Sequence, residues 1–448
     1  MGRTPGIRAL KATRMTKKKH YNWKIGDPLP EIGRQSLAKH DVFARYVDRY
    51  IRILSPQPAK RELNLTIIDG FCGGGKYVLD GAEIDGSPLV LLKAVRATET
   101  GMALERKNGF IVKSDFYFVD KKAEHIDFLR SELGKTEFAP ELERTIHLIT
   151  SKFESQIHSI IEVIKSKGTS HRALFFLDQY GWSDISFGAI RRIFNELRNP
   201  EVTLTFSVDS LINYFREETT KQRSGRAIEL TDEFAERLLS FKTDHGGRYL
   251  IQNFLYRHVR EKTGALFYTP FFIKSPDSHR SYWLLHLSKH ERARDEMARL
   301  HWSLGNTFVH HGGAGFNALG FDPTVDPDQI HLNFDFGSDA RVDSLNAALD
   351  QLPKLIRDDA PGHGVPVSIE ELFKARCNET PVTMPLMSEA LVKLRDELKE
   401  VEILTPEGKV RPKAVNLNWD DLVRLPQQRS FFRVLTPTQA SSPLGNRE

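Results

Sequence analysis

The sequence predicts an α/β protein built on a doubly wound, mainly parallel sheet. Short, continuously apolar runs alternate with helix-like stretches about five times, and such runs are typical of strands covered on both faces. The first run leads directly into a glycine cluster, at the end of the strand where open α/β sheets bind their ligands. The five runs occupy residues 65–68, 116–119, 146–149, 173–177 and 202–208.

Helical periodicity fills the intervals between these runs. An amphipathic helix is expected before the sheet, at 39–54, and the others are expected at 88–98, 122–133, 153–167 and 188–199. Charge-rich, helix-like sequence at 211–265 then interrupts the alternation. Two further apolar runs, 266–273 and 281–287, predict a terminal antiparallel hairpin, whereas 305–343 is predicted to be irregular because it is rich in Gly, His and Asp and has little period.

Composition argues against a membrane-spanning protein, and the distribution of charge places the basic residues in the N-terminal arm. The 448 residues are 40% hydrophobic and 27% charged, and no stretch approaches the ~18 apolar residues of a membrane-spanning helix, so no membrane association is expected. The net charge is +5, yet residues 1–26 carry eight lysines and arginines and no acid, which leaves −3 for the rest (5 minus 8). A solvated, disordered basic arm and an arm that contacts nucleic-acid phosphates are both compatible with this pattern.

The two cysteines, Cys72 and Cys377, have no metal-binding spacing and cannot form a disulfide framework, so a cytoplasmic location is expected. After residue 366, a capping box at Ser368 and Glu371 and a β-wing around Gly408 suggest a winged-helix-like module. Its second helix carries balanced charges, which favours a protein contact over DNA binding. The expected segments are an arm at 1–26, a core at 27–210, a helical insert at 211–265, remaining strands at 266–365, the winged-helix-like module at 366–435 and a tail at 436–448.

The glycine cluster admits two interpretations. Gly70 to Lys76 formally matches the GxxxxGK of a phosphate-binding P-loop, but Tyr77 stands where Ser or Thr should bind magnesium, and no helix pattern follows. The same residues also read Asp-x-Phe-x-Gly-x-Gly, through Asp69, Phe71, Gly73 and Gly75 together with Gly70. This second pattern resembles the cofactor loop of class I methyltransferases, which have a Rossmann-like fold and use S-adenosylmethionine.

The resemblance implies two further cofactor residues. A second acid, Asp120, ends the second strand, where it is expected to accept the ribose hydroxyls; it could equally cap the next helix. Phe153 follows the third strand, where it could stack on adenine or be the first core residue of its helix.

The fourth strand ends in Asp178-Gln179-Tyr180-Gly181-Trp182, an acid followed by aromatic residues at the edge of the same cleft. This segment is partly similar to the Asp-Pro-Pro-Tyr of amino methyltransferases. We expect Asp178, Gln179 and Tyr180 to face the methyl acceptor, with Asp178 orienting or deprotonating it. A buried structural turn is the alternative.

Taken together with Gly86-Ser87-Pro88 and Ser281-Tyr282-Trp283-Leu284-Leu285, these motifs resemble the three-Cys-motif partner (TcmP) family over most of the chain. Gln179, Gly74 and Cys72 depart from the residues usual in that family. The resemblance implies a Rossmann-like methyltransferase fold and a bacterial system that also encodes a three-Cys-motif protein of iron–sulfur or radical S-adenosylmethionine type.

Two functional hypotheses come from the methyltransferase resemblance, and a third, a nucleotide hydrolase using Lys76, comes from the P-loop interpretation. Of the first two, one is an S-adenosylmethionine-dependent methyltransferase with an unknown acceptor, and the other is a degenerate Rossmann module that docks the three-Cys-motif partner. No metal site is expected, because His301, His310, His311 and His331 lack metal-binding spacing and Asp322, Asp326 and Asp328 lack the remaining ligands of a calcium loop.

Overall fold

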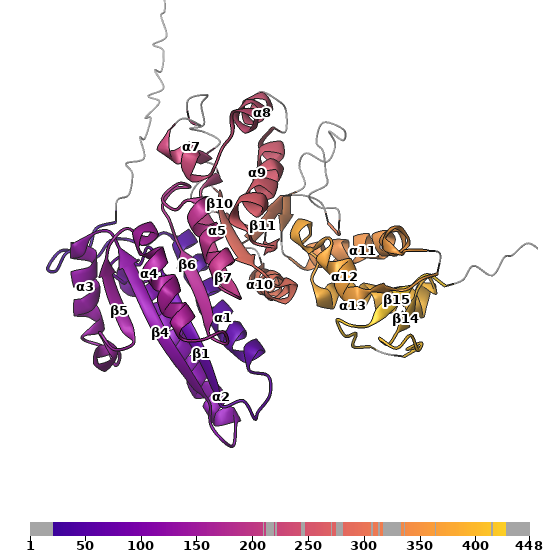
Figure 1. The fold of residues 1–448 in the computed structure, drawn as a ribbon, viewed down its shortest axis with the longest axis horizontal. Helices are drawn as coiled ribbons and strands as arrows, with labels where there is room; N and C mark the ends of the chain where they lie inside the picture. The colour runs from indigo at the N-terminus through magenta and orange to yellow at the C-terminus, as the bar shows by residue number, and fades with distance from the viewer. Residues whose placement is uncertain are drawn as a thin grey trace, which may run out of the picture. The chain divides into compact units, whose positions relative to one another are not determined.

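The structure is a computed structural model, and its ribbon is drawn in Figure 1. It divides into two compact units, the first comprising Met1–Gly313 with Leu319–Gly337 and the second comprising Ala314–Ala318 with Ser338–Glu448. The residues that the structure describes are 21–208, 210–211, 219, 222–242, 247–269, 271–274, 281–305, 308–311, 314–316, 333–335, 337–362, 364–413 and 415–426.

A single large sheet forms the centre of the first unit. Its strand order is β12-β11-β9-β10-β7-β6-β1-β4-β5, with β8 paired to β10. The pairs from β7 to β5 are parallel, whereas β10 is antiparallel to both β7 and β9. The strands are β1 (Glu62–Asp69), β4 (Ile111–Asp120), β5 (Ile146–Thr150), β6 (Arg172–Leu177), β7 (Pro200–Phe206), β8 (Phe267–Tyr268), β9 (Phe271–Lys274), β10 (Ser281–Ser288), β11 (Phe308–His311) and β12 (Asn333–Asp335).

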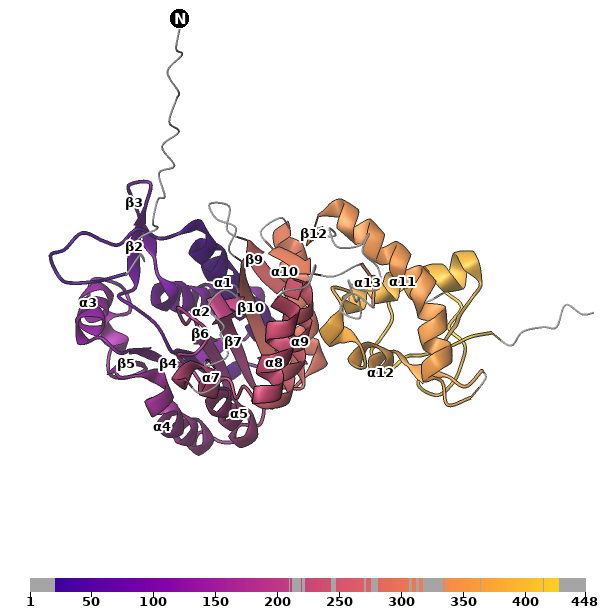
Figure 2. The same cartoon turned by 90° about the horizontal axis from the view of Figure 1, so that it is seen from above.

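Helices cover both faces of this sheet. Figures 1 and 2 show α1 and α2 on one face and α4 and α5 on the other, and α10 packs beside α1 and α9 beside α5. No helix of the described residues is long and apolar enough to cross a membrane. The helices are α1 (Arg34–Leu54), α2 (Ser87–Glu105), α3 (Ala123–Leu133), α4 (Phe153–Ser166), α5 (Phe187–Glu196), α7 (Arg223–Ala227), α8 (Asp232–Lys242), α9 (Gly247–Thr263) and α10 (Glu291–Leu304).

The predicted α/β class and the alternation of strands and helices are confirmed, and five parallel strands followed by an antiparallel pair are consistent with a Rossmann-like methyltransferase fold. Two local predictions are wrong. The run 266–273 is not one strand, because it divides into β8 and β9, which pair with different parts of β10. The segment 305–343 is not irregular throughout, since it contains β11 and β12, short edge strands formed by pairing outward from β9.

Helix α1 lies against the sheet along β6 and β7. It runs from the carboxyl end of β6 to the amino end of β7. Its apolar side chains recur at helical spacing, so one face is buried, and that face also carries Lys39. Lys39 bonds to Asp178 just beyond the end of β6, and Phe43 lies 4.7 Å from Phe176, measured between ring centroids. Further along the helix, the Tyr46 hydroxyl donates a hydrogen bond to the Glu201 carboxylate on β7.

The second unit has a helix–strand–helix–helix–strand–strand order and a small antiparallel sheet, β13-β15-β14. The structure begins this unit's continuous stretch at Ser338, earlier than the boundary expected at 366. Ser368 caps α12 through the Glu371 amide at 3.4 Å, as the capping box predicts. The elements are α11 (Ser338–Asp359), β13 (Val367–Ser368), α12 (Ile369–Lys374), α13 (Met384–Lys393), β14 (Glu402–Leu404) and β15 (Leu422–Arg424).

Candidate cofactor and acceptor site

Three acidic residues stand at the carboxyl ends of three adjacent strands. Asp69 is the last residue of β1, Asp120 is the last of β4, and Asp178 directly follows β6. Since β4, β1 and β6 are neighbours and parallel, these carboxylates lie along one edge of the sheet. The chain leaves β1 toward β4 but reaches β6 on the opposite side, so this edge is the position where the strand order reverses.

The glycine loop after β1 is fixed to both neighbouring strands. The Gly70 amide donates to Phe176 O on β6 at 3.0 Å, and the Cys72 amide donates to Val119 O on β4 at 3.1 Å. The loop continues into the antiparallel hairpin of β2 (Lys76–Leu79) and β3 (Ala82–Asp85), in which Lys76 Nζ bonds to Asp85 Oδ1 at 2.8 Å. A P-loop requires a helix and a free lysine here, so the phosphate-loop interpretation is wrong.

The indole of Trp23 lies against the glycine loop. Trp23 is 4% exposed, and its Nε1 donates to Lys76 O at 2.5 Å. A Cβ at Gly74 would stand 2.3 Å from Trp23 Cγ, and one at Gly73 would stand 2.8 Å from the ring, so the glycines are needed for this packing whatever ligand is bound. Trp23 falls within the arm expected at 1–26; residues 1–20 lie outside the described residues.

A pocket of about 720 Å³ opens where β1, β4 and β5 end, and we call it the strand-end pocket. Of the residues expected to bind a cofactor, Gly70, Phe71, Asp120 and Phe153 line it, whereas Asp69, Gly73 and Gly75 do not. The other lining residues are Lys121, Ser151, Lys152, Glu154, Ser155, Ser183, Asp184, Gln222 and Ser224. Its size lies within the range of about 300–1,000 Å³ typical of small-molecule sites.

Asp120 borders this pocket with part of its hydrogen-bonding capacity already used. Oδ1 accepts from the Lys122 amide at 2.9 Å and lies 3.2 Å from His125 Nδ1, while Oδ2 accepts from the Gly73 amide at 3.2 Å. Burial alone would raise the pKa of Asp120, but hydrogen bonds from His125 and two backbone amides bring that pKa below its usual value. Asp120 is therefore an anion, and Oδ2 retains a lone pair for a hydroxyl donor.

Asp69 lies beneath the glycine loop and is 1% exposed. Oδ1 accepts from the Phe71 amide at 3.1 Å, whereas Oδ2 is buried without a hydrogen-bond partner among the described residues. Burial raises the pKa of Asp69 to about 7, and the nearby Ser87 side chain and Phe71 amide only partly offset it. An unsatisfied buried carboxylate oxygen is a position for a ligand's donor, for which an ammonium group is the best match.

Phe153 is compatible with both alternatives that the sequence left open, a core residue of its helix and a contact for adenine. It is 3% exposed and packs beside Phe71 and Phe175, with ring centroids 6.4 and 6.5 Å apart, so it is a core residue of α4. It also lines the strand-end pocket.

Gly75 packs against Leu129 and has a φ of +79°.

Asp178 is held by a lysine from the helix that precedes the sheet. Lys39 Nζ lies 2.5 Å from each carboxylate oxygen, and the side chains of Lys39 and Asp178 are only 9% and 22% exposed. Burial would raise the pKa of Asp178, but the charge and hydrogen bonds of Lys39 outweigh burial and lower it. Asp178 is thus an anion whose two oxygens already bind an ammonium group.

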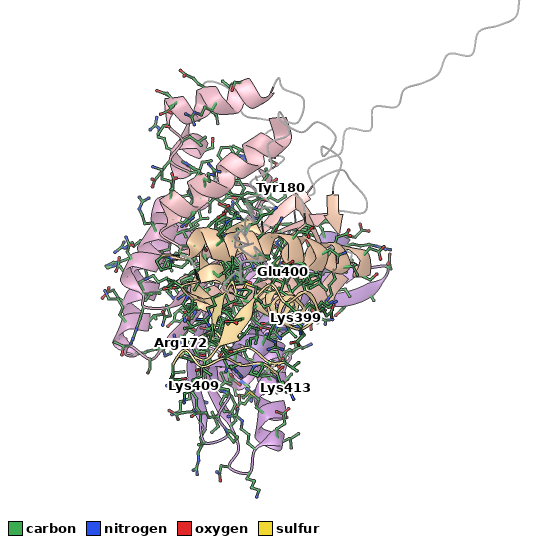
Figure 3. The ribbon with its side chains drawn as sticks, turned by 90° about the vertical axis from the view of Figure 1, so that its right-hand side faces the viewer. Arg172, Tyr180, Lys399, Glu400, Lys409 and Lys413 are labelled. Carbon is green, nitrogen blue, oxygen red and sulfur yellow. The ribbon has the colours of Figure 1, made fainter. Side chains whose placement is uncertain are left out.

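The other two residues expected at the acceptor side differ from each other. Gln179 is 2% exposed, and its Oε1 accepts from the amides of Asp184 at 2.9 Å and Ile185 at 3.2 Å. It therefore holds the turn before α5 and does not line the strand-end pocket. Tyr180, labelled in Figure 3, is 61% exposed.

Sequence reasoning assigned no role to Lys39 or Trp23. One signal for Lys39 was available, because its spacing of four from Phe43 places a cation on the apolar face of an amphipathic helix, where a charge requires a partner. Nothing in the sequence identified that partner, 139 residues away.

Among the described residues, no group of three or more His, Cys, Asp or Glu side chains is arranged to hold a metal ion. His301 is buried within α10. The side chains of His310 and His311, and all of Asp322, Asp326, Asp328 and His331, lie outside what the structure describes.

Comparisons with known proteins give distant structural neighbours. No protein-family model matches the sequence, and no curated protein does. Protein LPL1258 of Legionella pneumophila, of the DUF519 family, has a TM-score of 0.26 at 12% identity over 43% of this chain and 74% of its own. The cyclopropane synthase MmaA2 of Mycobacterium tuberculosis has a TM-score of 0.23 at 8% identity over 56% and 84%. Since both TM-scores are below 0.5, the functional conclusions rest on the sheet order and the site itself.

Proposed function

We propose that this chain is an S-adenosylmethionine-dependent methyltransferase of the three-Cys-motif partner type that binds the cofactor in the strand-end pocket. The observation that carries the proposal is the pocket of about 720 Å³ lined by Gly70, Phe71 and Asp120 at the ends of β1 and β4. The cofactor would supply an activated methyl group on a sulfonium. The acceptor would lie near Asp178 and Tyr180, at the end of β6.

The residues present fit the three parts of such a cofactor. Asp120 Oδ2 has a lone pair for a ribose hydroxyl, and the edge of Phe153 in the pocket offers an apolar contact for adenine. Asp69 does not line the pocket and lies beneath the glycine loop, so its unpaired Oδ2 would meet the ammonium of the methionine part only after the loop moves. Since an ammonium near Asp69 would lower a pKa that stands at about 7, binding would release a proton near neutral pH.

Calorimetric titration with S-adenosylmethionine, S-adenosylhomocysteine and ATP tests this proposal. We expect the first two to bind and ATP not to bind, and we expect Asp120→Ala to weaken binding at least tenfold, or about 1.4 kcal/mol. Titrations in buffers of different ionisation enthalpy should reveal the released proton.

Asp115→Ala is the matched control, because Asp115 is an acid on the same strand that pairs with Lys167 and does not line the strand-end pocket. Equal weakening by both substitutions, or binding of ATP alone, would contradict the proposed cofactor site.

A second candidate function is a Rossmann module that docks the three-Cys-motif partner without catalysis. Lys39 favours it, because its ammonium occupies both oxygens with which Asp178 would orient an acceptor, and Gln179 serves the adjacent turn. The paired variant Lys39→Met/Asp178→Asn separates the two candidates. It should abolish methyl transfer and retain cofactor binding if the chain is an enzyme, whereas a docking module should retain its partner affinity.

We propose that the second unit is a winged-helix-like module that contacts protein. Its strand order β13-β15-β14 and the wing between β14 and β15 support the topology. Helix α13 contains one cation, Lys393, and its Glu389 is engaged by Arg341, so this helix lacks the positive charge of a DNA-reading helix. Lys399, Lys409 and Lys413, which are labelled in Figure 3, follow the end of α13 at Lys393.

A further inference from the structure

A second cavity lies at the opposite end of the sheet from the strand-end pocket. It has a volume of about 380 Å³, and we call it the amino-end groove because its floor is formed where β6 and β7 begin. The floor is made by Arg172, Asn199 and Glu201, one wall by α1 through Tyr46, Tyr50, Ile53 and Leu54, and the other wall by the first turns of α10.

The acid in this groove has one engaged oxygen and one available oxygen. Glu201 Oε2 accepts from the Tyr46 hydroxyl and lies 3.0 Å from His286 Nε2. For Oε1, no hydrogen bond is formed within the described part of the chain, although the Glu201 side chain is only 12% exposed. A carboxylate oxygen in such surroundings is a strong acceptor for a cationic donor.

The cation in the groove is equally uncommitted. Arg172 Nη1 reaches the Asn199 side-chain oxygen at 2.8 Å, with the amide oriented so that its nitrogen also donates to Arg198 O. Arg172 makes no ion pair with any described residue, Glu201 included. Tyr50 lines the same groove as both charges, and the pKa of its phenol is raised by burial and then by Glu201, whereas Arg172 acts in the opposite direction.

Two opposite charges that share a cavity without neutralising each other match a ligand with both charges of its own. An ammonium would bond to Glu201, and a carboxylate would form the forked pair that guanidinium groups prefer with Arg172. The carboxylate would also lie toward the first turn of α10, where the helix dipole favours an anion, although the Arg292 amide already donates to the His290 side chain. The rest of the lining combines apolar contacts from Ile53, Leu54 and the tyrosine rings with the polar side chains of His290, Arg292 and Glu296, the last of which pairs with Arg49.

We propose that the amino-end groove binds a free α-amino acid with an apolar side chain. This site is separate from the proposed cofactor pocket, and the inference does not depend on the methyltransferase function. The side chain would lie along Ile53 and Leu54, with the two charged groups between Arg172 and Glu201. The volume of about 380 Å³ admits a single amino acid and excludes a long peptide.

The test is calorimetric titration of the full chain with L-phenylalanine, phenethylamine and hydrocinnamate. The last two each lack one charge of the first. We expect L-phenylalanine to bind saturably and each single-charge analogue to bind at least about tenfold more weakly, or 1.4 kcal/mol. Equal binding of all three, or no binding of L-phenylalanine and L-leucine, would overturn the proposal.

Variants place the binding site. Ile53→Trp enlarges a side chain that is 48% exposed at the groove's rim and leaves the Tyr46–Glu201–His286 contacts untouched, so it should abolish binding without unfolding the protein. Leu104→Trp, at a position 85% exposed on α2 and outside the groove, is the matched control and should bind normally. Arg172→Gln should weaken the binding of L-phenylalanine more than the binding of phenethylamine, which has no carboxylate. Binding that survives Ile53→Trp would place the ligand elsewhere and overturn the assignment.

Discussion

The ends of β4 and β6 carry the same sequence pattern, an apolar strand followed by an aspartate, but the two aspartates have opposite environments. Asp120 borders an open pocket and keeps a lone pair on Oδ2, whereas both oxygens of Asp178 bind Lys39. The strands themselves do not produce this difference. It arises because α1 delivers an ammonium to the end of β6, whereas the donors near Asp120 in the described part of the chain are backbone amides and His125. A strand-end acid is therefore a ligand site only where no other element has satisfied it.

Removing the Lys39 ammonium that α1 places at the end of β6 should have the largest effect on the free energy of unfolding. Lys39→Met leaves the buried Asp178 without its partner, and breaking a buried pair in this way costs about 3–5 kcal/mol. Chemical denaturation should show this loss at pH 7. The loss should shrink at acidic pH, because the pKa of Asp178 rises when Lys39 is absent and its protonated form tolerates burial.

Arg45→Met on the same helix is the control. Its pair with Asp41 is exposed, so its removal should cost less than about 1 kcal/mol. If both variants lose equal stability, the pair at β6 is no stronger than a surface contact and the contrast with β4 fails. Adding Asp178→Asn to Lys39→Met should recover part of the stability.

Replacing Asp69, at the end of β1 between β4 and β6, should give the next largest change in stability, and that change depends on pH. The pKa of Asp69 is about 7 in the folded protein and near 3.8 when the residue is exposed, so between these values the folded state binds a proton that the unfolded state does not. Stability should therefore fall as the pH rises from about 4 to 7. Asp69→Asn should remove this fall and stabilise the ligand-free protein at pH 8 by up to about 4 kcal/mol.

Thermal unfolding of both proteins at several pH values measures this effect. At pH 3 the two should be nearly equally stable, because Asp69 is then mostly protonated in both folded and unfolded chains. A variant that is less stable than the parent at pH 8 would show that Asp69 is satisfied as an anion, in disagreement with an open ligand site at β1.

Crowding the glycine loop should have a smaller effect. Gly74→Ala places a Cβ 2.3 Å from Trp23 Cγ, so the indole must shift, and overpacking of this kind costs about 1–3 kcal/mol. The shift should be detectable in tryptophan fluorescence. Gly181→Ala is the control, because a Cβ there meets no atom within 4 Å and should change little. Unchanged fluorescence in Gly74→Ala would show that Trp23 does not cover the loop in solution.

The sequence by itself determined the α/β class, the parallel sheet and the order of its elements. Those features depend on local periodicity, which each segment carries without reference to the others. It also placed Asp69, Asp120 and Asp178 at strand ends, because a strand's end is marked by the change from apolar to polar residues. Ser368 as a helix cap belongs to the same class of local signals.

Only the tertiary structure decided what each of these residues contacts. The Lys39–Asp178 pair joins residues 139 positions apart, and Trp23 reaches a loop 50 residues away, so neither contact leaves a local pattern. The same holds for the short strands β11, which pairs with β9, and β12, which pairs with β11, because neither has a period of its own. Whether a buried carboxylate is open to a ligand depends on which donors the fold brings to it, because an unpaired charge in the interior is costly and is satisfied by any donor within reach.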